Sequence, residues 1–127
     1  MEVFKYIPEV HRPLIDEWSK DRIEVHAPPP EIGYVAYAGK EPIAAIFLLR
    51  AESKTCIIDG LIANPKIKNP VRANAIYIIV DRLINDAKAL GFETIIAWTS
   101  NASTFEKAMN FGFKPLIGEI VIAKDLR

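Results

Sequence analysis

Apolar residues recur every three or four positions between Asn69 and Leu90, the spacing of one face of a helix. Asn69 followed by Pro70 predicts the helix start, with the asparagine as N-cap and the proline in the first turn. Gly91 predicts the helix end, because glycine readily takes the left-handed conformation that closes helices. The apolar face comprises Ala73, Ile76, Tyr77, Val80, Leu83, Ile84, Ala87 and Leu90.

Short apolar segments between turn residues predict strands in the first half of the chain. Three of them follow one another with short connections, which predicts an antiparallel meander. Gly60, inside the third, predicts a bulge or a close approach of two backbones. The three strands cover Tyr34 to Ala38, Ile43 to Arg50 and Lys54 to Ala63, and an earlier strand covers Val3 to Ile7.

A second helical pattern runs from Pro8 to Ile23, and Pro13 suits its first turn better than its interior. A stiff extended loop from Glu24 to Ile32 follows, because it contains the consecutive prolines Pro28 to Pro30. The apolar side of the helix carries Leu14, Ile15 and Trp18.

The second half predicts a strand from Glu93 to Trp98, a helix from Ser100 to Asn110, and one bent strand or two from Gly112 to Ala123. The first of these should lie parallel to Lys54–Ala63, since a crossover helix joins the two. The predicted fold is therefore α/β (α+β), a single domain of residues 1–127 with a mixed sheet. Trp98 is interpreted as the end of a core strand.

Composition narrows the classes of function. Sixteen basic and sixteen acidic residues give no net charge, which argues against broad nucleic-acid binding. Cys56 is the only cysteine, so it is interpreted as a packed thiol in a reducing compartment. The N-terminus has no signal-peptide pattern, and the longest apolar runs are too short to span a membrane. A soluble cytoplasmic protein is expected.

The order of meander, crossover helix, parallel strand, short helix and Gly-Phe resembles the GNAT (N-acetyltransferase-like) superfamily over essentially the whole chain. The segments that carry the resemblance are Ile58 to Pro65, Ala87 to Phe92 and Asn101 to Phe113. The resemblance implies a GNAT-like fold, acetyl-CoA as co-substrate, and transfer of an acetyl group to an amine. It also implies that the coenzyme's pantetheine arm runs along the open edge of the central strand, with the pyrophosphate at the helix start.

Carried over by position, the resemblance implies a set of coenzyme-binding residues. Backbone groups of Leu61, Ile62 and Ala63 would pair with the pantetheine amides. The turn from Lys66 to Asn74, the basic turn, would hold the pyrophosphate, because free amides and the helix dipole favour an anion. The remaining members of the set are Lys68, Arg72, Ala73 and Asn101. An alternative interpretation is that the basic residues of this turn are merely solvated.

The chain departs from the family pattern in three places, one of which is that Pro8 to Ile32 contains one clear helix where two are usual. Counting from Arg72 puts Ala75 where the pyrophosphate turn has its first glycine, whereas counting back from Gly91 puts Asn74 there. Neither register restores glycine, which lets phosphate oxygens approach the backbone. Tyr77 is interpreted as a core residue. Ala108 stands where many members carry the tyrosine that protonates the departing thiolate.

Asp59 is the candidate catalytic base, because it lies on the central strand beside the expected cleft, where burial could raise its pKa. A merely edge-exposed aspartate is the competing interpretation. His26, Glu24 and Glu31 are interpreted as solvated loop residues. No metal-ligand spacing occurs, so no metal site is expected.

Two hypotheses of function stay open. One is an acetyl-CoA-dependent N-acetyltransferase acting on a small-molecule amine or a protein amino group. The other is a non-catalytic GNAT-like binding or structural protein, of a virus-type or accessory kind. Neither a membrane nor broad nucleic-acid binding is expected as a partner. A homodimer could form through the strand near the C-terminus.

Overall fold

The computed structural model describes residues 1–20, 32–51, 54–98, 102–116, 124 and 126. Its elements follow one another as β1 (Glu2–Lys5), α1 (Pro8–Ser19), β2 (Ile32–Ala38), β3 (Glu41–Arg50), β4 (Thr55–Ala63), α2 (Asn69–Ala89), β5 (Thr94–Ile96) and α3 (Ala102–Asn110). The strands form one sheet in the order β1-β2-β3-β4-β5. The first four strands are antiparallel and β4–β5 is parallel, so the predicted mixed sheet is confirmed.

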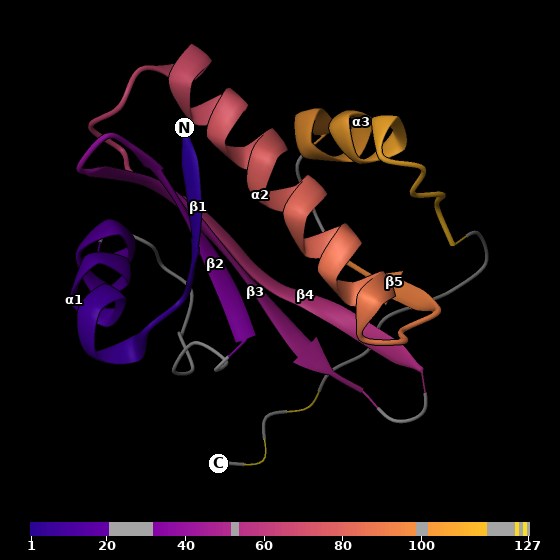
Figure 1. Cartoon of the computed structure of the whole chain (residues 1–127). Helices are drawn as coiled ribbons and strands as arrows, with labels where there is room; N and C mark the ends of the chain where they lie inside the picture. Colours follow the sequence, from indigo (N-terminus) through magenta and orange to yellow (C-terminus); the bar gives the residue numbers. More distant parts are fainter. Residues whose placement is uncertain (21–31, 52–53, 99–101, 117–123, 125, 127) are drawn as a thin grey trace.

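The helices cover both faces of the sheet (Figure 1). α1 packs on one face, where Ile15 joins a cluster with Tyr6, Val35, Phe47 and Ile62. α2 packs on the other face of the sheet through the buried side of the helix. This side consists of Ala75, Ile79, Val80, Leu83 and Ala87. α3 lies beside α2, and the rings of Tyr77 and Phe111 meet between them with centroids 4.7 Å apart.

Tyr34 of β2 contacts α2 through both its ring and its hydroxyl group. Its ring is buried and lies 5.8 Å from the Arg82 guanidinium carbon. Burial, followed by a hydrogen bond to Asp86, raises the pKa of Tyr34 to about 12. Arg82 Nε also contacts Asp86 Oδ2 at 3.0 Å, so β2 and the last turns of α2 share one polar network.

Both Gly-Phe pairs of the sequence end a helix in the same way. After α2, Gly91 has φ 91°, its N–H donates to Lys88 O, and the N–H of Phe92 donates to Ala87 O. This paired pattern is a Schellman cap. After α3, Gly112 (φ 86°) and Phe113 repeat it with Met109 O and Ala108 O. The predicted glycine stop of α2 is therefore confirmed.

Several predicted boundaries were wrong. α1 ends at Ser19, and Pro13 lies inside it because Pro8 already takes the first turn. β1 ends at Lys5, since Ile7 becomes the residue before α1. β5 covers only three residues, and Trp98 beyond it is 58% exposed, so Trp98 does not end a core strand. Residues 112–116 contain no strand, and most of the strand expected up to Ala123 lies outside the described residues.

Cys56 is a packed thiol, as predicted. Its side chain is fully buried in the cluster beneath α2, and burial raises the pKa of the thiol. The Sγ atom lies 3.6 Å from the carbonyl oxygen of Thr94 on β5, where the parallel pair begins.

Candidate functional site

The parallel strands β4 and β5 stay together for three residue pairs only. The pairs are Thr55 with Thr94, Cys56 with Ile95 and Ile57 with Ile96. β4 continues to Ala63 and keeps its pairing with β3 on the other side. Within the described residues, positions 58–63 of β4 therefore have no strand beside them on the β5 side, which leaves a row of peptide groups available there.

A β-bulge lies where β4 leaves β5. Gly60 pairs with Phe47 and Ile58 pairs with Leu48, so Asp59 is the extra residue of the bulge. The bulge predicted from Gly60 is thus confirmed, and a Cβ at Gly60 would meet the Phe47 ring at 3.4 Å. The Asp59 side chain is exposed, so the burial expected beside the cleft is not found.

One hydrogen bond shows to which edge of β4 the peptide groups past the bulge point. The N–H of Asn64 donates to Ile43 O of β3 at 2.8 Å. Peptide groups alternate between the two edges of a strand. The N–H and C=O groups of Ile62 therefore also point to β3, whereas those of Leu61 and Ala63 point to the open edge. The sequence predicted that backbone groups of all three residues lie at the open edge. In the structure, those of Leu61 and Ala63 do, whereas those of Ile62 lie at the edge that pairs with β3.

Asn64 organises the turn after β4. Its side chain is 9% exposed and makes two hydrogen bonds, accepting from the N–H of Lys66 at 3.0 Å and donating to Pro42 O at 3.2 Å. The N–H of Ile67 adds a bond to Asn64 O at 3.2 Å. The sequence interpretation gave Asn64 no such role, although asparagine is a frequent organiser of turns.

The start of α2 offers few free backbone donors. Lys68 precedes the helix, and its carbonyl oxygen accepts from the N–H groups of both Val71 and Arg72 at 3.1 Å. Pro70 has no N–H to offer. Asn69 is the first helical residue rather than the predicted N-cap, and its side chain accepts a hydrogen bond from the Arg72 guanidinium. An anion here would be held mainly by side-chain charge.

The basic turn supplies that charge from Lys66, Lys68 and Arg72. Among the described residues, neither of its lysines forms a salt bridge. The pKa of Glu17 on α1 is lowered, first by its hydrogen bond to Lys20 and also by the charge of Lys66. Ala73 and Asn74 are exposed in the next turn of α2.

Tyr77 is 57% exposed, so its interpretation as a core residue was wrong. It lies two positions after the buried Ala75, roughly on the opposite side of the helix at 3.6 residues per turn. The Tyr77 ring instead packs on the Phe111 ring. Ala108 lies in α3, three residues before Phe111, and has no hydroxyl group.

Some candidate residues cannot be placed. Asn101, His26, Glu24 and Glu31 lie outside the described residues. In the described part of the chain, no group of three or more His, Cys, Asp or Glu side chains could hold a metal ion. No described helix is long and apolar enough to cross a membrane.

No protein-family model and no curated protein matches this sequence. Solved structures do match: the ribosomal-protein-S18-alanine N-acetyltransferase of Escherichia coli has a TM-score of 0.74 at 11% identity, covering 89% of this chain and 77% of that one. The GNAT fold is present. A GNAT family acetyltransferase of Streptococcus pneumoniae has a TM-score of 0.65 at 16% identity, covering 98% of both chains. An acetyltransferase of Streptococcus agalactiae has a TM-score of 0.68 at 18% identity, covering 99% of this chain and 91% of that one. At these identities the likeness is one of fold, and it agrees with the GNAT resemblance of the sequence.

Proposed function

We propose that the chain is an acetyl-CoA-dependent N-acetyltransferase whose acceptor is a small-molecule amine or a protein amino group. The observation that carries this proposal is the β5-side edge of β4 past Asp59, which has no strand partner among the described residues and leads directly into the basic turn. In a GNAT fold this edge is where an extended ligand with amide groups can add to the sheet. A reducing compartment such as the cytoplasm suits the single buried thiol.

The pantetheine arm fits the open edge of β4. The outward peptide groups of Leu61 and Ala63 can bond its amides as a neighbouring strand would. Ile62 contributes by packing its buried side chain against the α1 face, which fixes the strand in place. Ile62 therefore supports the site through packing, whereas its backbone groups serve β3.

The pyrophosphate fits less closely, because few amides are free and glycine is absent. Lys66, Lys68 and Arg72 would hold it by charge, with Ala73, Asn74 and Asn101 as the further expected contacts. Charge held at an exposed turn is screened by salt over about 8 Å at physiological ionic strength. Coenzyme affinity should therefore weaken as salt rises.

Acetyl-CoA supplies an acetyl thioester as the acyl donor. The acceptor must lose a proton to become a nucleophile, and Asp59 can take that proton directly or through water, since its side chain is solvated at the bulge. The amine nitrogen bonds to the acyl carbon, the carbon–sulfur bond breaks, and coenzyme thiolate leaves. Because Ala108 has no hydroxyl, the thiolate takes its proton from solvent, which a pKa near 8.5 permits.

A second candidate is a GNAT-fold module that binds a ligand without catalysis. The observation that favours it is the start of α2, which has few free N–H groups for a phosphate. Pro70 has no N–H, and the N–H groups of Val71 and Arg72 both donate to Lys68 O. Ala108 in place of a tyrosine points the same way.

Coenzyme binding separates the first candidate from a chain with no CoA site. Acetyl-CoA at one hundred times its dissociation constant should stabilise the protein by about 2.7 kcal/mol in a thermal unfolding titration. Ala63→Pro removes an N–H that faces the open edge, whereas Ala63→Ser keeps it, so only the proline variant should lose the shift. No shift with the parent protein at millimolar acetyl-CoA rules out the enzyme.

Turnover tests the role of Asp59. We expect Asp59→Asn to lower kcat for an acetylated amine by about 100- to 10,000-fold while leaving the acetyl-CoA shift unchanged. Unchanged turnover would remove Asp59 from the mechanism. A parent protein that binds acetyl-CoA but acetylates neither polyamines, aminoglycosides, amino acids nor protein amino groups would favour the binding module.

A further inference from the structure

The strand β1 lies at the outer edge of the sheet, beyond β2. The N–H of Tyr6 donates to Gly33 O of β2 at 2.8 Å, so Tyr6 faces the sheet. By the alternation of peptide groups, Phe4 and Glu2 also face β2, whereas Val3 and Lys5 point their N–H and C=O groups outward. Within the described residues no strand pairs with this outer edge.

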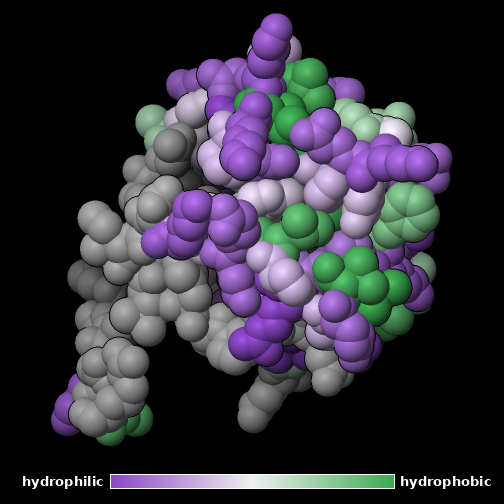
Figure 2. All heavy atoms as spheres, turned by 90° about the vertical axis from the view of Figure 1, so that its left-hand side faces the viewer, coloured by the Kyte–Doolittle hydropathy of each residue, from purple (hydrophilic) through white to green (hydrophobic). Residues whose placement is uncertain are grey.

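Large apolar side chains are exposed along the same edge. Met1 is 45%, Phe4 47%, Ile7 48% and Val10 57% exposed. Phe4, Ile7 and Val10 also line a hollow of about 390 Å³ beside Tyr37, between β1, the start of α1 and the β2–β3 turn. Figure 2, which faces the side on which α1 lies, shows apolar side chains reaching the surface between polar ones. An open strand edge next to exposed apolar groups is a site for strand addition.

We propose that this edge binds a second copy of the chain, whose β1 adds antiparallel to β1 and joins the two sheets. In an antiparallel pair, two residues that lie opposite each other point their peptide groups either both toward the partner strand or both away from it. When the two strands are copies related by a two-fold axis, this condition is met only if one residue lies opposite its own copy. With Phe4 opposite Phe4 of the second copy, Val3 lies opposite Lys5. Each of these two symmetry-related pairs exchanges two backbone hydrogen bonds.

The sequence of β1 favours this register and this partner. Phe4 meets Phe4 of the second copy, and the exposed Met1 and Ile7 lie just beyond the two ends of the paired strand. In this register Glu2 lies opposite Tyr6, which carries a hydroxyl group. Centring the pair on Val3 would instead place Glu2 against Phe4, which has no polar group, and Met1 against the charged Lys5. A second copy therefore supplies both the strand and the apolar side chains in register, which an unrelated strand would have to supply separately.

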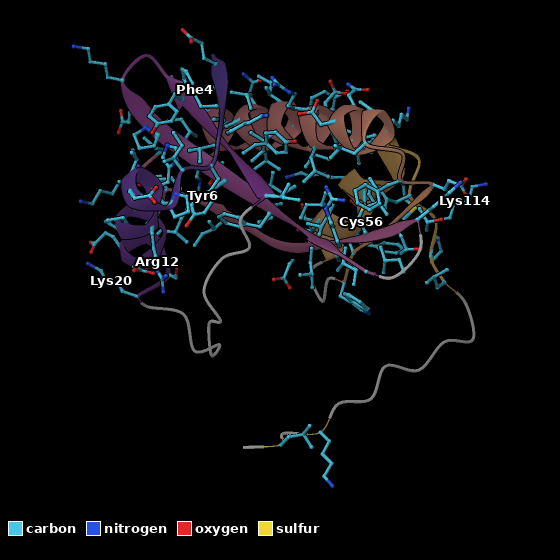
Figure 3. The ribbon with its side chains drawn as sticks, turned by 60° about the horizontal axis from the view of Figure 1, so that its bottom comes forward. Phe4, Tyr6, Arg12, Lys20, Cys56 and Lys114 are labelled. Carbon is cyan, nitrogen blue, oxygen red and sulfur yellow. The ribbon has the colours of Figure 1, made fainter. Side chains whose placement is uncertain are left out.

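This surface is separate from the proposed coenzyme cleft. β1 and β5 are the opposite edges of the sheet. Figure 3 shows Phe4 and Tyr6 beside α1, away from Cys56 in the part of β4 that pairs with β5. The dimer therefore leaves the open edge of β4 accessible, and it does not depend on the acetyltransferase proposal. It also differs from the expected dimer near the C-terminus, most of which lies outside the described residues.

Lys5→Pro tests the proposal with a matched control. Lys5 is exposed and its N–H points outward, so proline removes an intermolecular donor without removing a bond of the β1–β2 pair. Phe4, the residue before it, is already extended, as proline requires. Lys5→Ala loses the same side chain but keeps the N–H. It also relieves the diagonal approach of the two Lys5 charges.

Sedimentation equilibrium across micromolar to millimolar protein should show a dimer for the parent chain and for Lys5→Ala. The dissociation constant of Lys5→Pro should rise about ten-fold or more, with thermal unfolding at low concentration confirming that the variant folds. Amide hydrogen exchange should slow at Val3 and Lys5 as concentration rises. A parent chain that stays monomeric, a Lys5→Pro variant that dimerises equally, or protection that appears elsewhere would each overturn the proposal.

Discussion

At the scale of the residue, His11 is a buried histidine whose hydrogen bonds fix its protonation state. The N–H of Ile7 donates to Nδ1 at 2.9 Å, so the ring proton must sit on Nε2. Nε2 lies 2.8 Å from the Tyr37 hydroxyl and can donate to it. The ring is 3% exposed, and burial lowers the pKa of His11 below its ordinary value. The fold therefore favours the neutral ring.

This arrangement predicts a loss of stability in mild acid. The unfolded chain binds a proton at His11 near pH 6.5, whereas the folded chain binds it only at a lower pH. The contribution of His11 to the free energy of unfolding should therefore be constant above pH 6.5. It should fall as the pH decreases from 6.5 to the folded-state pKa. Urea unfolding at a series of pH values measures this slope.

His11→Gln is the matched variant, because an amide can accept from Ile7 and donate to Tyr37 without titrating. We expect the slope between pH 6.5 and 5 to become smaller in this variant. Tyr37→Phe keeps the histidine and should keep the slope. A parent protein with no slope in this range would contradict the assignment of His11 as a neutral, buried group.

The roles of individual residues were predicted only where they follow from local chemistry. Gly91 and the Gly60 bulge follow from what glycine permits, so the sequence was enough for both. His11 and Asn64 depend on partners far along the chain, Tyr37 and Pro42, which sequence spacing does not bring together. Asp59 was placed on the correct strand, but its exposure depends on the side to which the bulge turns it.

At the scale of the element, the type and order of the described helices and strands were predicted, whereas their ends often were not. The apolar periodicity predicted the helix α2, but it identified the buried face only in part. Val80, Leu83 and Ala87 are buried as expected, whereas the buried Ala75 and Ile79 were missed. The short β5 could not be bounded, because the apolar run from Thr94 to Trp98 looks the same in sequence whether or not a strand continues to pair. Its early departure from β4, which creates the open edge, is a tertiary property.

At the scale of the whole molecule, burial is concentrated in the central strands and α2. Ile43, Ile46, Leu48, Ile79 and Leu83 are among the largest fully buried side chains. α3 has no buried residue, although Phe111 beyond it packs against the same cluster. Regions with few buried apolar groups open at low free energy, whereas core elements open only with the whole molecule. α3 should thus open at a lower free energy than β3 and α2.

Hydrogen exchange on the parent protein should show this difference directly. We expect amides of α3 to exchange through local opening, and those of β3 and α2 to exchange at the free energy of global unfolding. Leu83→Ala, at a fully buried position, should lower that global value by about 2 to 5 kcal/mol. Phe105→Ala, at a position 43% exposed on α3, should lower it by only about 0.5 kcal/mol. Equal losses in the two variants, or α3 amides protected as strongly as those of β3, would show that α3 belongs to the same cooperative unit as the sheet.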